Sequence, residues 1–385
     1  MTNPVYLDNA ATTPLDQRVL EAMLPYLRGP RGNASSLHAS GASARDAVEE
    51  ARESVASFLG ASPEEVVFTG GGTESDNLAL LGLAAADPEK RHVVVSKVEH
   101  AAVRRSALHL ESFGYEVSWL DVDAAGIVDP GQLSEALRPD TALVAVMWAN
   151  NEIGSVQPVH ELAEICAERG VPYHADAVQA AGRVRIKVGD VPVSTLALSG
   201  HKLYGPQGVG ALYLRQGVEV KPVIHGGGQE RGLRSGTENM VGIVGLGTAA
   251  RLAREELEER ARHEADLRDQ VLNGLGGISG VHLNGHAERR LSNNAHLRVE
   301  GVEAEGLVLF CDALGFEIGS GSACASGGHK ASPVLLAMGQ SEQEAFSAVR
   351  ITVGKDNTVE EIGGFIEAFS GAVEQLRELS PLYTN

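Results

Sequence analysis

The chain has 385 residues, of which 43% are hydrophobic and 22% charged, values typical of a folded globular protein. Its length is enough for two domains with at least one large buried core. The net charge of -19 argues against a general binder of nucleic acids or anionic membranes, because an acidic surface repels both.

Targeting signals and cysteine usage indicate the compartment. No apolar segment approaches membrane-spanning length, and the first residues lack the basic and apolar regions of a secretory signal. We therefore expect a cytoplasmic protein with no membrane partner and no direct nucleic-acid partner. Cys166, Cys311 and Cys324 are too few and too scattered for a disulfide framework or a zinc site, so we expect reduced thiols and no metal site.

Hydrophobic periodicity predicts an alternation of helices and short buried strands over the first 215 residues. The expected helices cover residues 17–26, 40–59, 100–113 and 159–169. The expected strands cover residues 66–69, 92–96, 115–120, 142–148, 172–176, 194–198 and 210–214. This alternation predicts a mostly parallel sheet flanked by helices, in which ligands bind at the carboxyl ends of the strands.

The remaining sequence predicts a second, smaller domain of α+β type. A long helical pattern from about residue 241 to 275 leads away from the sheet, and a final helix begins at a capping box formed by Thr358 and Glu361. We therefore assign residues 15–257 to a large cofactor-binding domain, and residues 1–14 plus 258–385 to a small domain that carries Cys324.

The strand at residues 66–69 runs into a glycine turn, and a helix follows. Because the free backbone N–H groups and the dipole of a helix N-terminus attract anions, Gly72 and Thr73 are candidates for phosphate binding. A simple strand-to-helix turn and a nucleotide site remain alternatives, although the glycine spacings of dinucleotide and P-loop sites are absent.

Lys202 follows a buried strand, between the donors Ser199 and His201 and a Gly/Pro turn. A lysine between two buried strands is costly unless it is paired or chemically used. A desolvated amine beside phosphate-binding donors is what a Schiff-base cofactor requires. An exposed lysine on a surface turn is the alternative.

Three further positions could serve such a site. Asp176 ends an apolar strand and could keep a pyridine nitrogen protonated, with Gln179 one helical turn later, or it could be a helix cap or a salt-bridge partner. His100 follows another strand and could stack on a ring and transfer protons, or be structural. Arg350 lies in an alternating strand, and it binds a substrate carboxylate only if it faces inward.

The three cysteines have different surroundings. Cys324 lies among glycine, serine and alanine, which is typical of a mobile loop that can deliver a thiol to a site. Cys166 and Cys311 lie in apolar helical patterns, so we expect both in the core.

Taken together, these stretches resemble the cysteine desulfurases, in particular the group that includes NifS and IscS in the class-V aminotransferase superfamily. The resemblance covers nearly the whole chain, in the ordered motifs YLDNAATTP, GGTESDN, VEH ending at His100, NNEIG from Asn150, HADAVQ, SGHKLYGP, RSGTEN and SGSAC followed by VRI. Several motifs in order are far more specific than any one of them.

The resemblance implies a homodimer of the pyridoxal-phosphate fold type I, with active sites at the subunit interface. It implies that Lys202 carries pyridoxal 5'-phosphate, that Asp176 pairs with the ring nitrogen and that His100 stacks on the ring. The phosphate would be held by Gly72, Thr73, Ser199 and His201, and by Thr237 reaching from the partner subunit. Asn151 and Gln179 would also contact the cofactor, with Asn151 near the substrate as well, and Arg350 would bind the substrate carboxylate.

The implied reaction converts L-cysteine to L-alanine and leaves a persulfide on Cys324. An acceptor protein, either a scaffold for iron–sulfur clusters or an enzyme of tRNA thiolation, would then take the sulfur. A transient role of Cys324 as an iron–sulfur ligand stays an open alternative.

Two departures from the family pattern and several alternatives remain. The family usually has a Ser-Leu-Glu-Pro-Ser-like stretch where this chain has residues 327–333 (GGHKASP), and it commonly has a proline at the position of Ala34. A selenocysteine lyase, or a β-lyase or aminotransferase that does not use Cys324, would share the same scaffold. A non-catalytic interaction scaffold and a nucleotide-binding protein are the alternatives from other classes.

Overall fold

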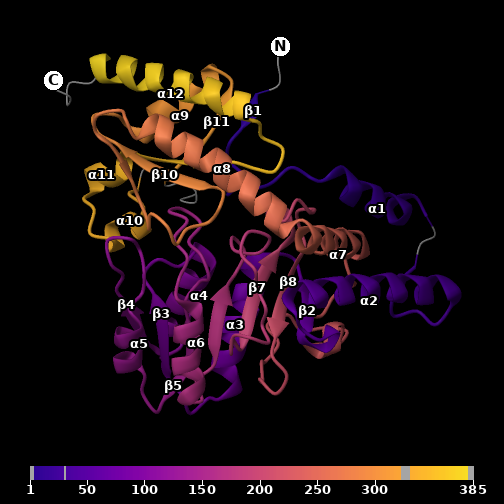
Figure 1. Cartoon of the computed structure of the whole chain (residues 1–385). Helices are drawn as coiled ribbons and strands as arrows, with labels where there is room; N and C mark the ends of the chain where they lie inside the picture. Colours follow the sequence, from indigo (N-terminus) through magenta and orange to yellow (C-terminus); the bar gives the residue numbers. More distant parts are fainter. Residues whose placement is uncertain (1–3, 30–31, 322–329, 380–385) are drawn as a thin grey trace.

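The computed structural model describes residues 4–29, 32–321 and 330–379. The larger of its two main sheets, shown in Figure 1, has seven strands. Their order is β2-β8-β7-β6-β5-β3-β4. β8 pairs antiparallel with both of its neighbours, and all other neighbours pair parallel. The strands are β2 (Val66–Thr69), β3 (His92–Ser96), β4 (Glu116–Leu120), β5 (Thr141–Ala145), β6 (Tyr173–Asp176), β7 (Thr195–Ser199) and β8 (Gly210–Leu214).

Helices cover both faces of this sheet, which explains why its central strands are continuous apolar runs. Successive side chains of a strand point to opposite faces, so Val93 and Val95 pack in one core and Val94 in the other. The first face is covered by α3 (Gly72–Ala86) and α4 (Ala101–Ser112). The opposite core includes side chains of α1 (Gln17–Arg28), α2 (Ala39–Leu59), α5 (Pro130–Ala136), α6 (Val159–Glu168) and α7 (Met240–Glu255).

A second, antiparallel sheet has the order β12-β13-β10-β9 and a core of its own. Its strands are β9 (Val281–Leu283), β10 (Asn294–Val299), β12 (Gly319–Ser320) and β13 (Ala348–Thr352). Three helices pack against it and lie together at one end of the molecule in Figure 1: α8 (Leu257–Leu275), α9 (Ala304–Ala313) and α12 (Val359–Leu379). The short helices α10 (Pro333–Ala337) and α11 (Glu342–Phe346) share a small cluster with Val98 and Ile153 of the larger part.

The N-terminal arm connects the two sheets. Its strand β1 (Val5–Tyr6) pairs with β11 (Phe316–Glu317), and the N–H of Asn9 then donates to the carbonyl of Thr352 over 3.2 Å. Further along, the N–H of Thr13 donates to the carbonyl of His201 over 2.9 Å. The arm therefore runs from the smaller sheet to the turn that carries Lys202.

The structure confirms the fold class and most of the predicted elements. The alternating pattern from residue 66 to 214 forms a mostly parallel sheet, and the final helix begins at the predicted capping box of Thr358 and Glu361. The predicted strand 142–148 is shorter in the structure: β5 ends at Ala145, although the N–H groups of Val146 and Trp148 still donate to carbonyls of β6. No described helix is long and apolar enough to cross a membrane. The domain boundaries at 15–257 and 258–385 stay a prediction.

One prediction was wrong, because the helical pattern of residues 241–275 forms two helices and not one. They meet at Glu256, whose backbone leaves the helical conformation with φ −106° and ψ 7°. Its carboxylate accepts hydrogen bonds from Arg18 and Arg260. The break therefore lies where α1 is tied to the junction of α7 and α8.

We predict that Gly210→Ala destabilises the fold. An added methyl would lie 2.5 Å from the carbonyl oxygen of Leu198 and 2.7 Å from the Cα of Gly71, and neither backbone atom can move freely. Overpacking of this kind costs about 1–3 kcal/mol, which urea unfolding would measure.

Gly189→Ala is the matched control, because the nearest atom to its added methyl is 4.0 Å away. We expect a change of less than about 0.5 kcal/mol there. Equal unfolding midpoints for the two variants would contradict this account of the close approach at Gly210.

Candidate active site

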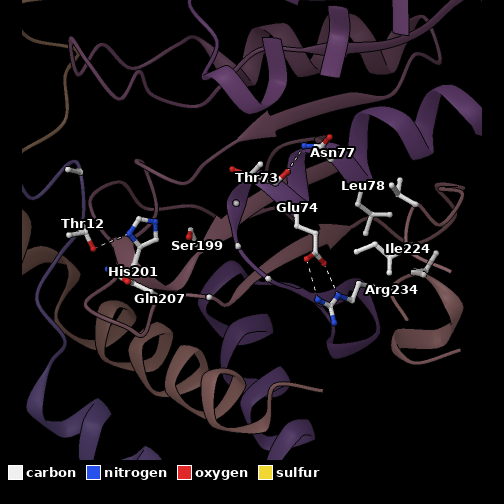
Figure 2. A pocket seen from close by; sticks show the side chains of 17 residues that line it. Thr12, Thr73, Glu74, Asn77, Leu78, Ser199, His201, Gln207, Ile224 and Arg234 are labelled. Carbon is white, nitrogen blue, oxygen red and sulfur yellow. Dashed lines mark hydrogen bonds and ion pairs between the residues drawn. The ribbon is translucent and has the colours of Figure 1, made fainter. Parts of the chain in front are cut away.

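Polar side chains gather at the carboxyl ends of the parallel strands, around a cavity of about 380 Å³. The cavity is lined by residues of the N-terminal arm, the start of α3, the ends of β6 and β7, and β13. A larger cavity of about 700 Å³ shares the start of α3 and the turn after β7 with it (Figure 2). The location agrees with the general rule for parallel sheets.

An anion-binding end is formed where β2 turns into α3. Gly71 precedes the helix with φ +151°, a conformation open to glycine, and the first N–H groups of a helix have no partner within it. Thr73, Ser199 and His201 line the same cavity, and all three also line the larger cavity, around which Figure 2 labels them. Burial lowers the pKa of the His201 imidazole to about 4, so this ring is neutral at pH 7.

Lys202 ends the short helical turn Gly200–Lys202 and points its amine at the N-terminal arm. The Nζ donates to the carbonyl of Ala11 over 2.6 Å and also to the carbonyl of Ala10. Both acceptors lie about 190 residues earlier in the chain. The arm thus holds the amine at the cavity, between the ends of two strands.

Asp176 is 5% exposed at the end of β6, where its carboxylate accepts the N–H of Val178 over 2.9 Å. Burial raises the pKa of this carboxyl, and nearby His100 and Lys202 offset part of the rise. Gln179 donates through Nε2 to the carbonyl of Ala10, while its buried Oε1 has no hydrogen-bond partner among the described residues. That oxygen remains available to a donor from a bound molecule.

His100 caps the start of α4, where its Nδ1 accepts the N–H of Ala102 over 3.2 Å. The preceding residue, Glu99, is 4% exposed and accepts hydrogen bonds from the Ser96 hydroxyl and the N–H of Met147. Its other oxygen is buried without a partner in the described structure. Burial raises the pKa of Glu99 to about 8, so the carboxyl is mostly protonated at neutral pH.

Arg350 is 2% exposed on β13 and faces the cavity. Its guanidinium donates to the carbonyl of Asn151 over 3.0 Å and to the Asp8 carboxylate over 2.8 Å. The Nε is buried and has no partner among the described residues. The inward orientation, which the alternating sequence left open, makes this group available for a carboxylate.

A further cavity of about 380 Å³ shares His100 and Asn151 with the first. Residues 330–333 line it, together with Glu152, whose pKa burial raises to about 7. Cys324 lies six residues before Lys330, outside the described residues. Cys166 and Cys311 are fully buried, and burial raises the pKa of both thiols to about 12, which confirms the core positions expected for them.

The structure brings most of the expected residues to one cavity. They are Gly72, Thr73, His100, Asn151, Asp176, Gln179, Ser199, His201, Lys202 and Arg350. Thr237 is exposed and lines neither this cavity nor the 700 Å³ cavity. Its expected role toward a partner subunit stays a prediction.

Sequence reasoning missed several functional contacts. Ala10 and Ala11 act through backbone carbonyls, and Asp8 pairs with an arginine 342 positions away, so no local pattern indicates these contacts. Asp76 lies within the GGTESDN motif, yet its type and position alone do not show that it reaches the cavity. In the sequence, the motif YLDNAATTP, which contains Asp8, Ala10 and Ala11, indicated that the arm belongs to the family resemblance.

Asp76, His100 and Asp176 each place a potential ligand atom within 4.8 Å of the others. Such spacing would also suit a metal ion, but it lies within the cavity already described. The expectation of no metal site stays a prediction.

Comparison with known proteins shows the family to which the chain belongs. The family model for class-V aminotransferases matches residues 5–365, and the chain belongs to this family. A cysteine desulfurase IscS from Methanosarcina thermophila is 45% identical over 379 residues, which cover 98% of this chain and 94% of that protein.

Solved structures agree with this relationship. A structure described as a NifS-like protein superimposes with a TM-score of 0.91 at 37% identity, covering 97% of this chain and 100% of that one. A second, described as SspA in complex with cysteine, has a TM-score of 0.82 at 37% identity and covers 92% of this chain and 100% of that one.

We predict that Glu99→Gln flattens the pH dependence of stability. The folded protein keeps the Glu99 proton up to about pH 8, whereas an ordinary glutamate releases it near pH 4.5. Unfolding therefore releases a proton between these values, and the free energy of unfolding falls as the pH rises, by about 1.4 kcal/mol per pH unit for one such group. Glutamine has no proton to release.

Urea unfolding of the protein at several pH values from 5 to 9 measures this effect. Between pH 5 and 8 the slope of the variant should be shallower by about 1 kcal/mol per pH unit, and above pH 8 the two curves should run parallel. Parallel curves over the whole range would show that Glu99 is charged in the folded protein.

Proposed function

We propose that this protein is a pyridoxal 5'-phosphate-dependent cysteine desulfurase that converts L-cysteine to L-alanine and transfers the sulfur to Cys324. One observation carries the proposal: the Lys202 amine, the Asp176 carboxylate and the Arg350 guanidinium line a single cavity. The names of the 45% identical relative and of the solved structures support the choice of substrate within the family.

The residues of the cavity fit the cofactor. The start of α3, with Thr73, Ser199 and His201, suits a phosphate because it offers backbone N–H groups, hydroxyls and an imidazole. Asp176 suits a ring nitrogen that carries a proton, and the unpaired Oε1 of Gln179 suits a donor on the cofactor. When bound, pyridoxal phosphate supplies an aldehyde for amines and a ring that withdraws electrons from the amino acid.

Three side chains of the cavity bind the substrate, hold the cofactor and move a proton. Arg350 binds the carboxylate of the substrate as a charge-assisted pair, to which its Nε, unpartnered among the described residues, contributes a donor. Lys202 contributes the amine that holds the cofactor between turnovers, and the arm carbonyls orient it. His100 is placed beside Asp176, where its imidazole can accept and return a proton.

Cys324 is proposed as the acceptor of sulfur. Its thiolate attacks the sulfur of the bound cysteine, the carbon–sulfur bond breaks, and the carbon takes a proton. Cysteine and the Cys324 thiol thus become alanine and the Cys324 persulfide, with no other oxidant or reductant. The small residues around Cys324 suit a segment that delivers sulfur away from the site.

The assembly and the partners are part of the same proposal. A homodimer would allow Thr237 of one subunit to reach the phosphate in the other. An acceptor protein for iron–sulfur cluster assembly or tRNA thiolation would take the persulfide sulfur, and the cytoplasm is the proposed compartment.

We predict that Lys202→Ala abolishes covalent attachment of the cofactor. Wild-type protein reconstituted with pyridoxal phosphate and reduced with borohydride should carry the cofactor's mass on the peptide that contains Lys202. The variant should carry none, while the exposed control Lys187→Ala should be labelled like the wild type. Labelling of another lysine in the wild type would refute the proposed attachment.

We predict that Cys324→Ser prevents persulfide formation. After incubation with cysteine, mass spectrometry of the wild type should find one extra sulfur on the peptide with Cys324. The serine variant should lack it and produce little alanine, while Cys166→Ala should keep it because that thiol is buried elsewhere. Sulfide and alanine formed by Cys324→Ser at the parent rate without added thiol would identify a β-lyase.

A further inference from the structure

A buried carboxyl without an assigned role lines the proposed cofactor cavity. Asp76, in the second turn of α3, is 1% exposed, and its Oδ1 lies 3.2 Å from Nε2 of His174. His174 and Asp176 are two residues apart on β6, so both side chains leave the same face of the strand. Asp76, Asp176 and His100 place one ligand atom each within 4.8 Å of the others.

It would cost much free energy to keep the carboxyls of Asp76 and Asp176 charged at the same time. They are buried within one small region, and charges this close repel strongly when water is excluded. Asp176 has the compensating groups, because it accepts the N–H of Val178 and lies near His100 and Lys202. Asp76 lies close to Asp176, and burial together with the charge of that carboxylate raises the pKa of Asp76.

The hydrogen bonds of His174 fit a protonated Asp76. Burial lowers the pKa of His174 to about 3, so its ring is neutral and carries one proton. Its Nδ1 lies 2.9 Å from the hydroxyl of Thr195, and its Nε2 faces Asp76. With the proton on Nδ1, that nitrogen donates to Thr195 and Nε2 accepts from the Asp76 O–H; with the proton on Nε2, the ring would donate to a charged Asp76 instead. The nearby buried Asp176, which has the compensating groups, favours the first arrangement.

We propose that Asp76 is a positioning residue that stays a neutral acid, donates its O–H to His174 and thereby leaves the negative charge on Asp176 at the cavity. The same hydrogen bond ties α3, whose start forms the anion-binding end, to β6, which carries Asp176. It therefore fixes the two contact points of the cofactor relative to each other. This proposal rests on the proposed function, because it assigns Asp176 to the ring nitrogen.

Infrared difference spectroscopy of the apoprotein tests the protonation state without any cofactor. At pH 7 the wild type minus Asp76→Asn spectrum should contain the C=O band of a protonated carboxyl, which shifts in heavy water. Wild type minus Asp176→Asn should instead contain carboxylate bands. A carboxylate band lost in Asp76→Asn, or a protonated band lost in Asp176→Asn, would overturn the proposal.

Titration of the apoproteins with pyridoxal phosphate, followed by absorbance, tests the positioning role. Asp76→Leu removes the donor and should weaken binding about tenfold, as loss of a supporting hydrogen bond does at other sites. Asp76→Asn keeps a neutral donor and should recover most of that loss. The control Asp87→Asn, exposed at the other end of α3, should bind like the wild type.

The outcomes separate this proposal from the proposed function. Equal weakening by asparagine and leucine, or wild-type binding by the leucine variant, would refute the positioning role. If the wild type itself fails to bind the cofactor, the proposed function fails, while the infrared result still decides whether Asp76 is protonated. If the leucine variant does not fold, the infrared spectra of Asp76→Asn still show whether Asp76 is protonated in the wild type.

Discussion

The site depends on keeping ionisable side chains out of water where the strands of the larger sheet end. A buried charge is costly unless hydrogen bonds or an opposite charge compensate for it. The buried arginine on β13 has a carboxylate and a carbonyl as partners, and the half-buried lysine after β7 has two carbonyls. The carboxyls at this edge are compensated in part by staying protonated, as the raised pKa of Glu99 shows. Compensation across several elements is what allows so many such groups to share one cavity.

The fold supplies rigid supports for these groups. Most of them lie at the ends of strands or at the first turn of a helix, where neighbouring hydrogen bonds fix the backbone. The arm reaches the cavity through a turn, and backbone hydrogen bonds hold it at Asn9 to β13 and at Thr13 to the turn that carries Lys202. A site built from strand ends and held from both sides suits chemistry that requires fixed positions for several groups.

Much of this arrangement could be predicted from the sequence, because it follows local patterns. Apolar runs that end in polar residues located Asp176 and Lys202, and the glycine turn located the start of α3. The orientation of Arg350 could not be predicted from alternation alone. It is decided by Val349 and Ile351, which pack in the core of the smaller sheet and thus turn the arginine to the opposite face. The roles of Asp8, Ala10 and Asp76 depend on contacts with distant segments, which no short pattern encodes.

The N-terminal arm has a consequence for how the molecule matures. Because the arm hydrogen-bonds to Arg350 and Thr352, more than 340 positions later, those contacts cannot form during synthesis until β13 has been made. The larger sheet, built from residues 66–214, can assemble well before that moment. A nascent chain would thus hold a nearly complete larger sheet before Arg350 exists to line the cavity, and the cavity would be completed only in a late closing step.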